Sequence, residues 1–393
     1  MTTELLAPAG GQEALVAAVQ SGADAVYMGF GAFNARRNAR NFSDEEFRAA
    51  VSYCHLRGVK VYLTLNTLVT DRELPALAAQ ARTASECGVD AILVQDWGVL
   101  ATLQKIIPDV PLHASTQMSL HTLSGVQEAA RLGMTRAVLA RELSRGEIAE
   151  ICQKSPIEIE TFVHGALCMC YSGQCEMSAV IGRRSGNRGA CAQPCRLPYG
   201  FSGRADGHPL SLKDANLAPF VPEMMDMGVA CLKIEGRMKS IHYVATVVSV
   251  YRKAIDAYWN DPQNYQVTDA WRQELEKVSH RPYTKGFAFG RPGSDGQVYT
   301  TSSYEQTHDF VGIVLAYDAA AKRAYIEQRN NVKNGEVLEI LMPDGELFPL
   351  TLEDMRNADG ESIDCAPHAQ QKFSIVSDRA LLPDSLLRRK VIC

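Results

Sequence analysis

The chain has 393 residues, of which 46% are hydrophobic and 22% are charged, and its formal net charge is −5. These are ordinary values for a globular enzyme with a large core, and they exclude a chain that coats nucleic acid nonspecifically. A local basic surface remains compatible with them. No apolar run reaches the roughly 18 residues that a membrane span needs, and the opening residues MTTELLAPAG lack the basic segment of a signal peptide. We therefore expect a soluble, cytoplasmic protein that does not bind a membrane.

Short apolar runs alternate with helical stretches along the first two thirds of the chain. Eight runs predict buried strands: ELLAPA (4–9), AVYMGF (25–30), VKVYLTLN (59–66), AILVQ (91–95), PLHAST (111–116), RAVLA (136–140), IEIETFV (157–163) and ACLKIEG (230–236). Helices are predicted between them, and the one that follows Ser43 opens with the S-x-x-E capping pattern. Eight alternations of this kind predict a parallel (β/α)8 barrel, an α/β fold of the TIM type.

The chain is predicted to divide into three parts. Residues 1–260 form the barrel and carry a cysteine-rich loop (166–200), part of an insertion of about sixty residues between the seventh and eighth strands. Residues 261–305 are a linker of helix and loop. Residues 306–393 alternate with period two and contain turn signals, which predicts a small antiparallel β-barrel of about six strands.

The cysteine-rich loop is the most informative stretch. Four of its thiols, Cys168, Cys175, Cys191 and Cys195, have the spacing C-x6-C-x15-C-x3-C, with Cys170 in the first gap and glycines between them. Disulfides are disfavoured if the compartment is reducing. Structural zinc usually shows two closely spaced cysteine pairs, and here only the last two thiols form one. An iron–sulfur cluster suits irregularly spaced thiolates in a glycine-rich loop, and a cysteine nucleophile paired with His164 is the remaining interpretation.

Active sites of such barrels lie at the carboxyl ends of the strands, so the residues after each run should face one cavity below the loop. Cationic and amide side chains there suit a dicarboxylate: Arg36, Arg37, Asn38, Arg40, Lys233 and Arg237. A solvated surface loop is the alternative for the first four. Lys233, Glu235 and Arg237 alternate along one strand and share a face, where they form either an ion-pair network or ligand contacts.

Candidate acid–base groups follow three of the strands. His113 and His164 end the fifth and seventh runs, and Glu235 lies on the eighth. Each histidine is either a proton-transfer group or a hydrogen-bonded core residue. Asp96 is either a mouth carboxylate or a helix cap. No H-E-x-x-H, G-x-S-x-G or P-loop motif is present, so a peptidase activity has no recognisable catalytic machinery.

Several motifs together resemble one known family. The stretch ETFVHGALC (160–168), followed by GQCEMS (173–178), resembles the signature of the collagenase-like peptidases, the unassigned-type peptidase family 32. ELLAPAG (4–10), GADAVYMG (22–29), CAQPCR (191–196) and LKIEGR (232–237) extend the resemblance over roughly residues 3–258. Older descriptions of the family are of peptidases. Better-understood relatives take part in oxygen-independent hydroxylation of tRNA, rRNA or the ubiquinone ring.

The resemblance implies a cofactor, a co-substrate and partners. Relatives bind a [4Fe–4S] cluster through cysteines, and those that act on RNA use prephenate as the hydroxyl donor. Carried over by motif, Cys168, Cys175 and Cys191 are ligands. A ubiquinone-type relative takes its fourth ligand from an insertion that this chain lacks, so Cys195 is assigned here, with Cys231 as its rival.

The expected function is therefore hydroxylation of a tRNA or 23S rRNA base. A collagenase-like peptidase, or a cluster-carrying partner in the hydroxylation of a small aromatic ring, is the alternative. A second protein of the same family is a candidate partner. Tyr283, Lys285, Phe287 and Phe289 in the linker either contact a nucleic-acid base or tether the linker to the barrel.

Overall fold

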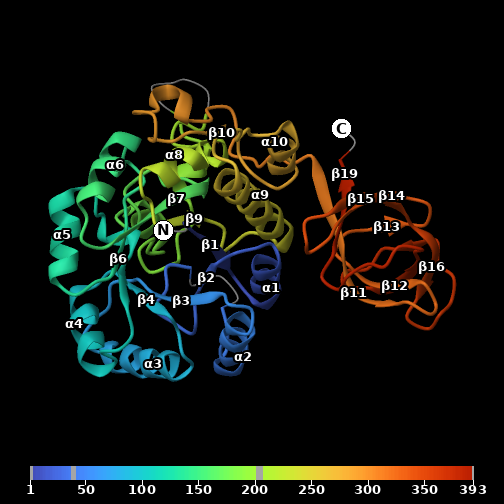
Figure 1. The fold of residues 1–393 in the computed structure, drawn as a ribbon, viewed down its shortest axis with the longest axis horizontal. Helices are drawn as coiled ribbons and strands as arrows, with labels where there is room; N and C mark the ends of the chain where they lie inside the picture. The colour runs from blue at the N-terminus through green and yellow to red at the C-terminus, as the bar shows by residue number, and fades with distance from the viewer. Residues whose placement is uncertain (1–2, 37–40, 201–206, 392–393) are drawn as a thin grey trace.

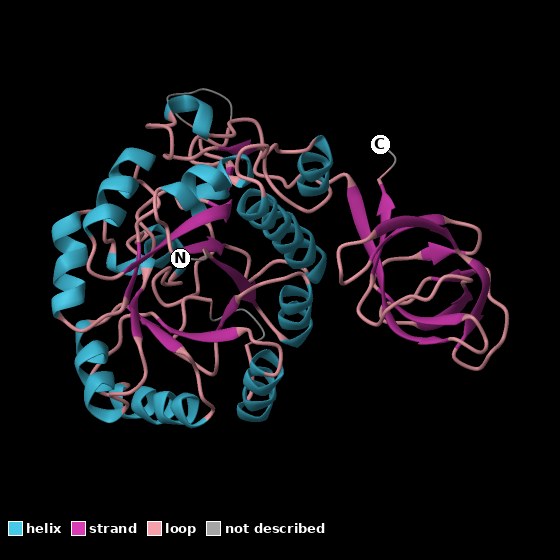
Figure 2. Ribbon diagram, in the orientation of Figure 1, coloured by secondary structure: helices cyan, strands magenta, loops and turns pink. Residues whose placement is uncertain are grey.

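The computed structural model describes residues 3–36, 41–200 and 207–391. Within these ranges, eight parallel strands form a closed barrel surrounded by helices (Figures 1 and 2). The barrel strands are β1 (Glu4–Ala9), β2 (Ala25–Met28), β3 (Lys60–Leu65), β4 (Ala91–Val94), β5 (Leu112–Ala114), β6 (Arg136–Val138), β7 (Glu158–Ala166) and β9 (Cys231–Ile234). The barrel closes because β9 pairs with both β1 and β7. The predicted TIM-like barrel is confirmed.

Each barrel strand is followed by a helix. These helices are α1 (Gln12–Gln20), α2 (Asp44–His55), α3 (Leu74–Glu86), α4 (Trp97–Ile106), α5 (Leu123–Arg131), α6 (Arg145–Lys154), α8 (Val221–Asp226) and α9 (Ile241–Asn260). Ser43 and Glu46 form the predicted reciprocal capping box at the start of α2, and Ser144 and Glu147 form another at α6. Across the described ranges, no helix has the length and apolar character required to cross a membrane.

The insertion between β7 and β9 contains α7 (Met177–Gly182) and β8 (Asp214–Asn216). Strand β8 pairs antiparallel with the last residues of β7, and β10 (Tyr283–Thr284) of the linker pairs with β8. The carboxyl end of β7 therefore extends past the barrel into a small side sheet. The segment 167–213, called the lid below, leaves and re-enters the fold at this sheet.

The C-terminal region is all β. Its main sheet has the order β15-β14-β19-β11-β12-β18-β16 and curls around its own core (Figure 2). The strands are β11 (His308–Asp318), β12 (Arg323–Gln328), β14 (Val337–Leu341), β15 (Leu347–Thr351), β16 (Glu353–Asn357), β18 (Lys372–Val376) and β19 (Leu386–Lys390). Strands β13 (Val332–Lys333) and β17 (Cys365–Ala366) form a separate pair. The described part of this sheet thus has seven strands, one more than the approximate expectation.

A buried cation joins the C-terminal region to the rest of the molecule. Arg388 of β19 is fully buried and forms ion pairs with Glu274, on α10 (Asp269–Glu276), and with Glu339 on β14. Lys277 just after α10 also contacts Glu339, at 2.8 Å. A buried arginine needs such partners to offset its loss of hydration. These ion pairs therefore hold the C-terminal region against α10.

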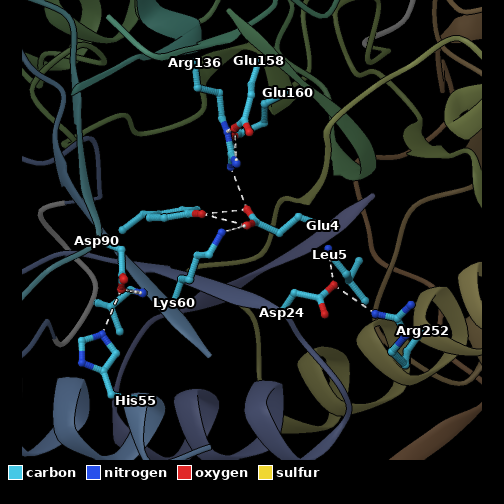
Figure 3. Close-up of polar contacts among 12 residues, drawn as sticks. Glu4, Leu5, Asp24, His55, Lys60, Asp90, Arg136, Glu158, Glu160 and Arg252 are labelled. Atoms are coloured by element: carbon cyan, nitrogen blue, oxygen red, sulfur yellow. Dashed lines mark hydrogen bonds and ion pairs between the residues drawn. The ribbon is translucent and has the colours of Figure 1, made fainter. Parts of the chain in front are cut away.

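The amino-terminal end of the barrel is filled by charges that neutralise one another (Figure 3). The Glu4 carboxylate accepts hydrogen bonds from the Tyr62 hydroxyl (2.8 Å), the Lys60 ammonium (3.1 Å) and the Arg136 guanidinium (2.7 Å). Arg136 also contacts Glu158 at 2.6 Å. Glu4, Lys60, Arg136 and Glu158 each begin a strand. This network therefore closes the end of the barrel opposite to the lid.

Candidate active site

A cavity of about 340 Å³ lies between the lid and the carboxyl ends of the barrel strands. Its size is in the range of small-molecule and cofactor sites, and its position is that of active sites in this fold. Residues that follow β3, β5 and β9 line it, including Asn66, Ser115 and Gly236, together with the lid residues from Leu167 to Arg196.

Four thiols face this cavity. Cys168, Cys175, Cys191 and Cys195 all line it. Burial raises the pKa of the Cys195 thiol; neighbouring Arg196 lowers it, and the other three thiols raise it further, so Cys195 lies near all three.

Cys231, the rival for the fourth ligand, lies elsewhere. It begins β9, is fully buried, and pairs in register with Glu4 and Glu160. Burial and the two nearby carboxylates raise the pKa of its thiol well above the usual value. A thiol in that environment stays protonated, and it is at the opposite end of the barrel from the lid. Among these candidates, Cys195 is therefore the one that lies with Cys168, Cys175 and Cys191.

The arrangement of the thiols can be compared with the needs of a metal centre. Among the described residues, no group of three or more His, Cys, Asp or Glu side chains could hold a metal ion as it stands. A single tetrahedral zinc ion needs its ligands to converge on one point. In a four-iron cluster each iron takes its own thiolate, so the ligands surround a volume instead. Four thiols around one cavity fit the second requirement better.

Hydrogen bonds fix the lid to the barrel mouth. The Asn187 amide oxygen accepts from the Leu68 backbone N–H (3.0 Å), and its amide nitrogen donates to the Gln95 side chain (3.0 Å) and the Gly173 carbonyl (3.2 Å). Gly173 has φ +82°, and a Cβ there would come within 2.4 Å of the Gln117 side chain. No sequence pattern singles out Asn187, because an asparagine in the glycine-rich stretch SGNRG (185–189) gives no distinct signal.

Lys233, Glu235 and Arg237 share one face of β9 and its extension, as predicted, and all three line the cavity. They do not pair with one another. The Lys233 ammonium donates to Glu160 on β7 at 2.7 Å and lies 4.4 Å from the centre of the Tyr27 ring. Glu160 is fully buried, so its charge is held by this lysine and by Arg136 at 3.5 Å.

Glu235 anchors two arginines at the mouth. The Arg36 guanidinium donates to it at 2.8 Å, and Arg141 lies 3.6 Å from its second oxygen. Burial by itself would raise the pKa of Glu235, but the two arginines lower it overall. A carboxylate held ionised in this way positions cations and does not serve as an acid. Its predicted catalytic role stays a prediction that this environment does not favour.

Arg237 differs from these residues because no carboxylate within the described ranges forms an ion pair with it. Its guanidinium donates to the side chains of Asn34 (3.2 Å), Thr64 (3.1 Å) and Asn41 (2.6 Å), and its Nε has no partner among the described residues. Burial lowers the pKa of this arginine to about 10. A buried cation with neutral partners only is ready to receive an anion.

The cavity carries a strong excess of positive charge. Six cationic side chains line it: Arg36, Arg141, Arg196, Lys233, Arg237 and Lys239. Glu235 is the one carboxylate among its described lining residues. Of the predicted dicarboxylate contacts, Arg36, Lys233 and Arg237 are thus brought together. Arg37, Asn38 and Arg40 lie outside the described residues.

His113 lies in the barrel interior, below the cavity lining. Its ring meets the edge of Tyr62, with centroids 5.1 Å apart, and its Nδ1 has no partner in the part of the chain that the structure describes. Burial, with the nearby charges of Arg136, Lys233 and Lys60, lowers the pKa of this histidine well below the usual value. Its predicted role in proton transfer remains a prediction, and its depth does not favour it.

His164 is enclosed by aromatic rings outside the cavity. Tyr243, Tyr251 and Tyr283 have ring centroids 6.0, 5.5 and 5.4 Å from it. Burial, together with His280 and Lys239, lowers the pKa of His164 to about 3, so the ring is neutral at physiological pH. Its predicted catalytic role is also untested and is not favoured by this cage.

Two further mouth residues had no predicted role. Lys239 continues the alternation of Lys233, Glu235 and Arg237 by one more step, and Tyr304 comes from the end of the linker. Extending the period-two pattern past Arg237 would have found Lys239.

Asp96 is a helix cap, since its carboxylate accepts hydrogen bonds from the backbone N–H groups at the start of α4.

Comparisons with known proteins agree with the resemblance stated above. The model of Peptidase family U32 matches residues 10–297, and that of the Peptidase family U32 C-terminal domain matches residues 306–388.

Three curated relatives are similar over most of this chain. The tRNA hydroxylation protein P1 of Bacillus subtilis is 40% identical, over 98% of this chain and 94% of its own. The 23S rRNA 5-hydroxycytidine C2501 synthase of Escherichia coli is 39% identical, over 75% of this chain and 46% of its own. A protein named collagenase from Porphyromonas gingivalis is 34% identical, over 73% and 74%.

Proposed function

Because this chain belongs to peptidase family U32, we propose that it hydroxylates a base of tRNA or 23S rRNA without dioxygen, using prephenate as the hydroxyl donor and a [4Fe–4S] cluster. The names of two similar relatives, a tRNA hydroxylation protein and an rRNA hydroxycytidine synthase, support RNA as the substrate. The tRNA protein matches nearly the whole chain, including the C-terminal region, which favours tRNA.

The observation that carries the proposal is the meeting of four thiols and six cations in one cavity. Cys168, Cys175, Cys191 and Cys195 would hold the cluster, which when bound supplies a redox-active iron centre beside the cavity. Thiolates are the ligands that such clusters prefer.

The cations would bind the donor. Prephenate carries two carboxylates, and guanidinium groups bind carboxylates through two parallel hydrogen bonds. Arg237 offers a buried positive charge that no carboxylate of the described ranges pairs with, and Arg36 and Arg141 are held in place by Glu235. Lys233 adds an ammonium group at the bottom of the cavity, where Glu160 holds it in place.

Lys239 is a further candidate for proton transfer, besides the two predicted histidines. Burial lowers the pKa of Lys239 to about 8, nearer to neutrality than that of either buried histidine. Its ammonium lines the cavity and donates to the Ser279 carbonyl at 2.7 Å. A group whose pKa is close to the working pH can both give and accept a proton.

Nucleoside mass spectrometry tests the proposal. Total tRNA and rRNA from a deletion strain should lack one hydroxylated nucleoside that the parent strain contains. Complementation with the wild-type gene should restore it, whereas a Cys168→Ser gene should not. An unchanged nucleoside profile in the deletion strain would refute the proposal.

A peptidase activity is the second candidate, and the relative named collagenase is the observation in its favour. A cysteine peptidase needs a histidine beside its thiol. No histidine is present among the described residues that line the cavity. Gelatin cleavage that persists in a Cys168→Ser, Cys175→Ser protein, together with normal RNA modification in the deletion strain, would establish a peptidase independent of the thiols.

A further inference from the structure

Two exposed side chains with large apolar surfaces stand at the mouth of the cavity. Met238 is 57% exposed and Tyr304 is 46% exposed, and both belong to the cavity lining. Each comes from a segment just outside the barrel, Met238 from the turn after β9 and Tyr304 from the end of the linker. Large apolar groups left in water beside charged ones indicate a contact surface for a ligand with an apolar face.

The Tyr304 ring is held in position by two cations. The Lys239 ammonium lies 3.9 Å from the ring centre, and the Arg281 guanidinium lies 4.3 Å from it. Both cations are themselves fixed: Lys239 donates to the Ser279 carbonyl, and Arg281 is buried within 3.6 Å of the Asp214 carboxylate. The exposed ring is therefore preorganised, and it loses little freedom when a ligand binds.

The surroundings identify the kind of ligand. The buried cations Lys233 and Arg237 suit the carboxylates of the donor, whereas Met238 and Tyr304 are exposed at the mouth, where a larger ligand would enter. A nucleobase has two apolar faces that stack on aromatic side chains, and the phosphates on either side of it are attracted by nearby cations. Enzymes that modify a base inside a folded nucleic acid turn that base out of its stack and into a pocket.

We propose that Tyr304 and Met238 form the entrance that grips the target nucleobase, an inference that rests on RNA being the substrate, as proposed above. The base stacks on the exposed part of the Tyr304 ring and contacts the Met238 thioether. Lys239, which lines the cavity beside the ring, also draws the neighbouring phosphates toward the mouth.

The experiment compares single variants in two assays. Genes for Tyr304→Ala, Tyr304→Phe and Met238→Ser complement the deletion strain, and the hydroxylated nucleoside is quantified. The hydroxylation rates of the purified anaerobic proteins are then measured over a range of concentrations of prephenate and of bulk tRNA from the deletion strain, or of its 23S rRNA if that is the RNA that lacks the modification. Tyr325→Ala is the matched control, because Tyr325 is 44% exposed but lies on β12 of the C-terminal region.

Loss of a stacked base weakens single-strand binding by about tenfold to a hundredfold. We expect Tyr304→Ala to raise the KM for RNA by such a factor, with the KM for prephenate, the melting temperature and the iron content unchanged. Tyr304→Phe keeps the ring and should stay within about threefold of wild type, because stacking uses the ring faces. Met238→Ser should have a smaller effect than Tyr304→Ala, and Tyr325→Ala none.

Failure of this inference is distinguishable from failure of the proposed function. If the deletion strain lacks no nucleoside, the RNA hypothesis itself is wrong. If wild type restores the nucleoside and Tyr304→Ala has a wild-type KM for RNA, the entrance has been misassigned. A Tyr304→Ala protein with lowered melting temperature and an equal loss for both substrates would show that the ring is structural, which also overturns the inference.

Discussion

The two ends of the barrel contain similar residue types in opposite states. At the amino-terminal end, Glu4 contacts Lys60, Tyr62 and Arg136, so each charge there has a counter-charge. Among the described residues at the carboxyl end, the cations outnumber the carboxylates, and the hydrogen-bond partners of Arg237 are neutral.

This difference separates charges that build the fold from charges that await a ligand. A buried charge keeps its ionised form only when the surroundings replace its hydration. At the closed end, opposite charges of the same chain replace the lost hydration. At the open end, Arg237 has no carboxylate partner among the described residues, and an anionic substrate would supply that negative charge. Four predictions test this distinction, from the largest expected effect to the smallest.

The cysteines should give the largest effect. Each single replacement by serine, at Cys168, Cys175, Cys191 or Cys195, should abolish the brown chromophore at about 400 nm that iron–sulfur clusters show. Iron and sulfide per chain should fall accordingly in anaerobically purified protein. Cys231→Ser, at the closed end, is the control and should retain both. A full iron content in Cys195→Ser would remove that residue from the ligand set.

Glu160→Gln should destabilise the closed end strongly. The substitution leaves the buried Lys233 ammonium without its carboxylate partner and reduces the negative charge that faces Arg136. Removing one partner of a buried ion pair costs about 3–5 kcal/mol. Urea unfolding monitored by circular dichroism measures the loss. Glu158→Gln is the matched control: Glu158 also contacts Arg136 but is 49% exposed, so its loss should cost about 1 kcal/mol or less. Equal losses for the two variants would contradict the assignment of Glu160 as a buried anchor.

Arg237→Gln should mainly affect ligand binding. A ligand at a hundred times its Kd stabilises a protein by about 2.7 kcal/mol. Prephenate should therefore raise the melting temperature of the wild type by several degrees, and most of that shift should disappear in Arg237→Gln. Arg131→Gln, which removes an exposed arginine paired with Glu128, should keep the full shift. A full shift in Arg237→Gln would show that the donor binds elsewhere.

Lys239 should give the smallest effect: the stability of the protein and its affinity for RNA should change with pH in opposite directions. Burial lowers its pKa to about 8 from an ordinary value of 10.5. Between these values the unfolded chain binds more protons, so this lysine makes stability rise with pH. RNA binding should instead weaken a fewfold as the pH passes about 8, because the charge is lost.

The Lys239→Arg variant separates this effect from general titration, since arginine stays charged throughout that range. Affinity for bulk tRNA, measured from pH 7 to 9.5, should be nearly flat for the variant. An equally steep decline in both proteins would assign the pH dependence to another group.

The sequence predicted the barrel well because its strands and helices carry local signals. Buried runs of valine, isoleucine and leucine marked all eight strands, and the capping pattern at Ser43 marked the start of α2. Strands β8 and β10 were not predicted, since two or three residues of polar sequence have no distinctive period. The alternation in β9 correctly gave one shared face for Lys233, Glu235 and Arg237.

Side-chain direction was harder to predict where strands are irregular. The register of β7 against β9 shifts between Phe162 and His164, and Gly165 follows with φ +102°. Such a bulge turns later side chains away from the face that alternation predicts. Phe162 consequently lines the cavity, whereas His164 packs among tyrosines outside it. No single-sequence pattern reveals that shift.

The pairing of β7 with β8 has a consequence for the life of the protein in air. Ala166 and Asp214 are register partners, so the chain segment that bears the four thiols is a loop tied off at its base by backbone hydrogen bonds. If the four thiols hold the proposed cluster, oxidation that strips its iron would loosen this loop and spare the barrel, whose core lies below the paired strands. The damaged molecule would thus be a substrate for repair by reinsertion of iron and sulfide, and need not be degraded and made anew.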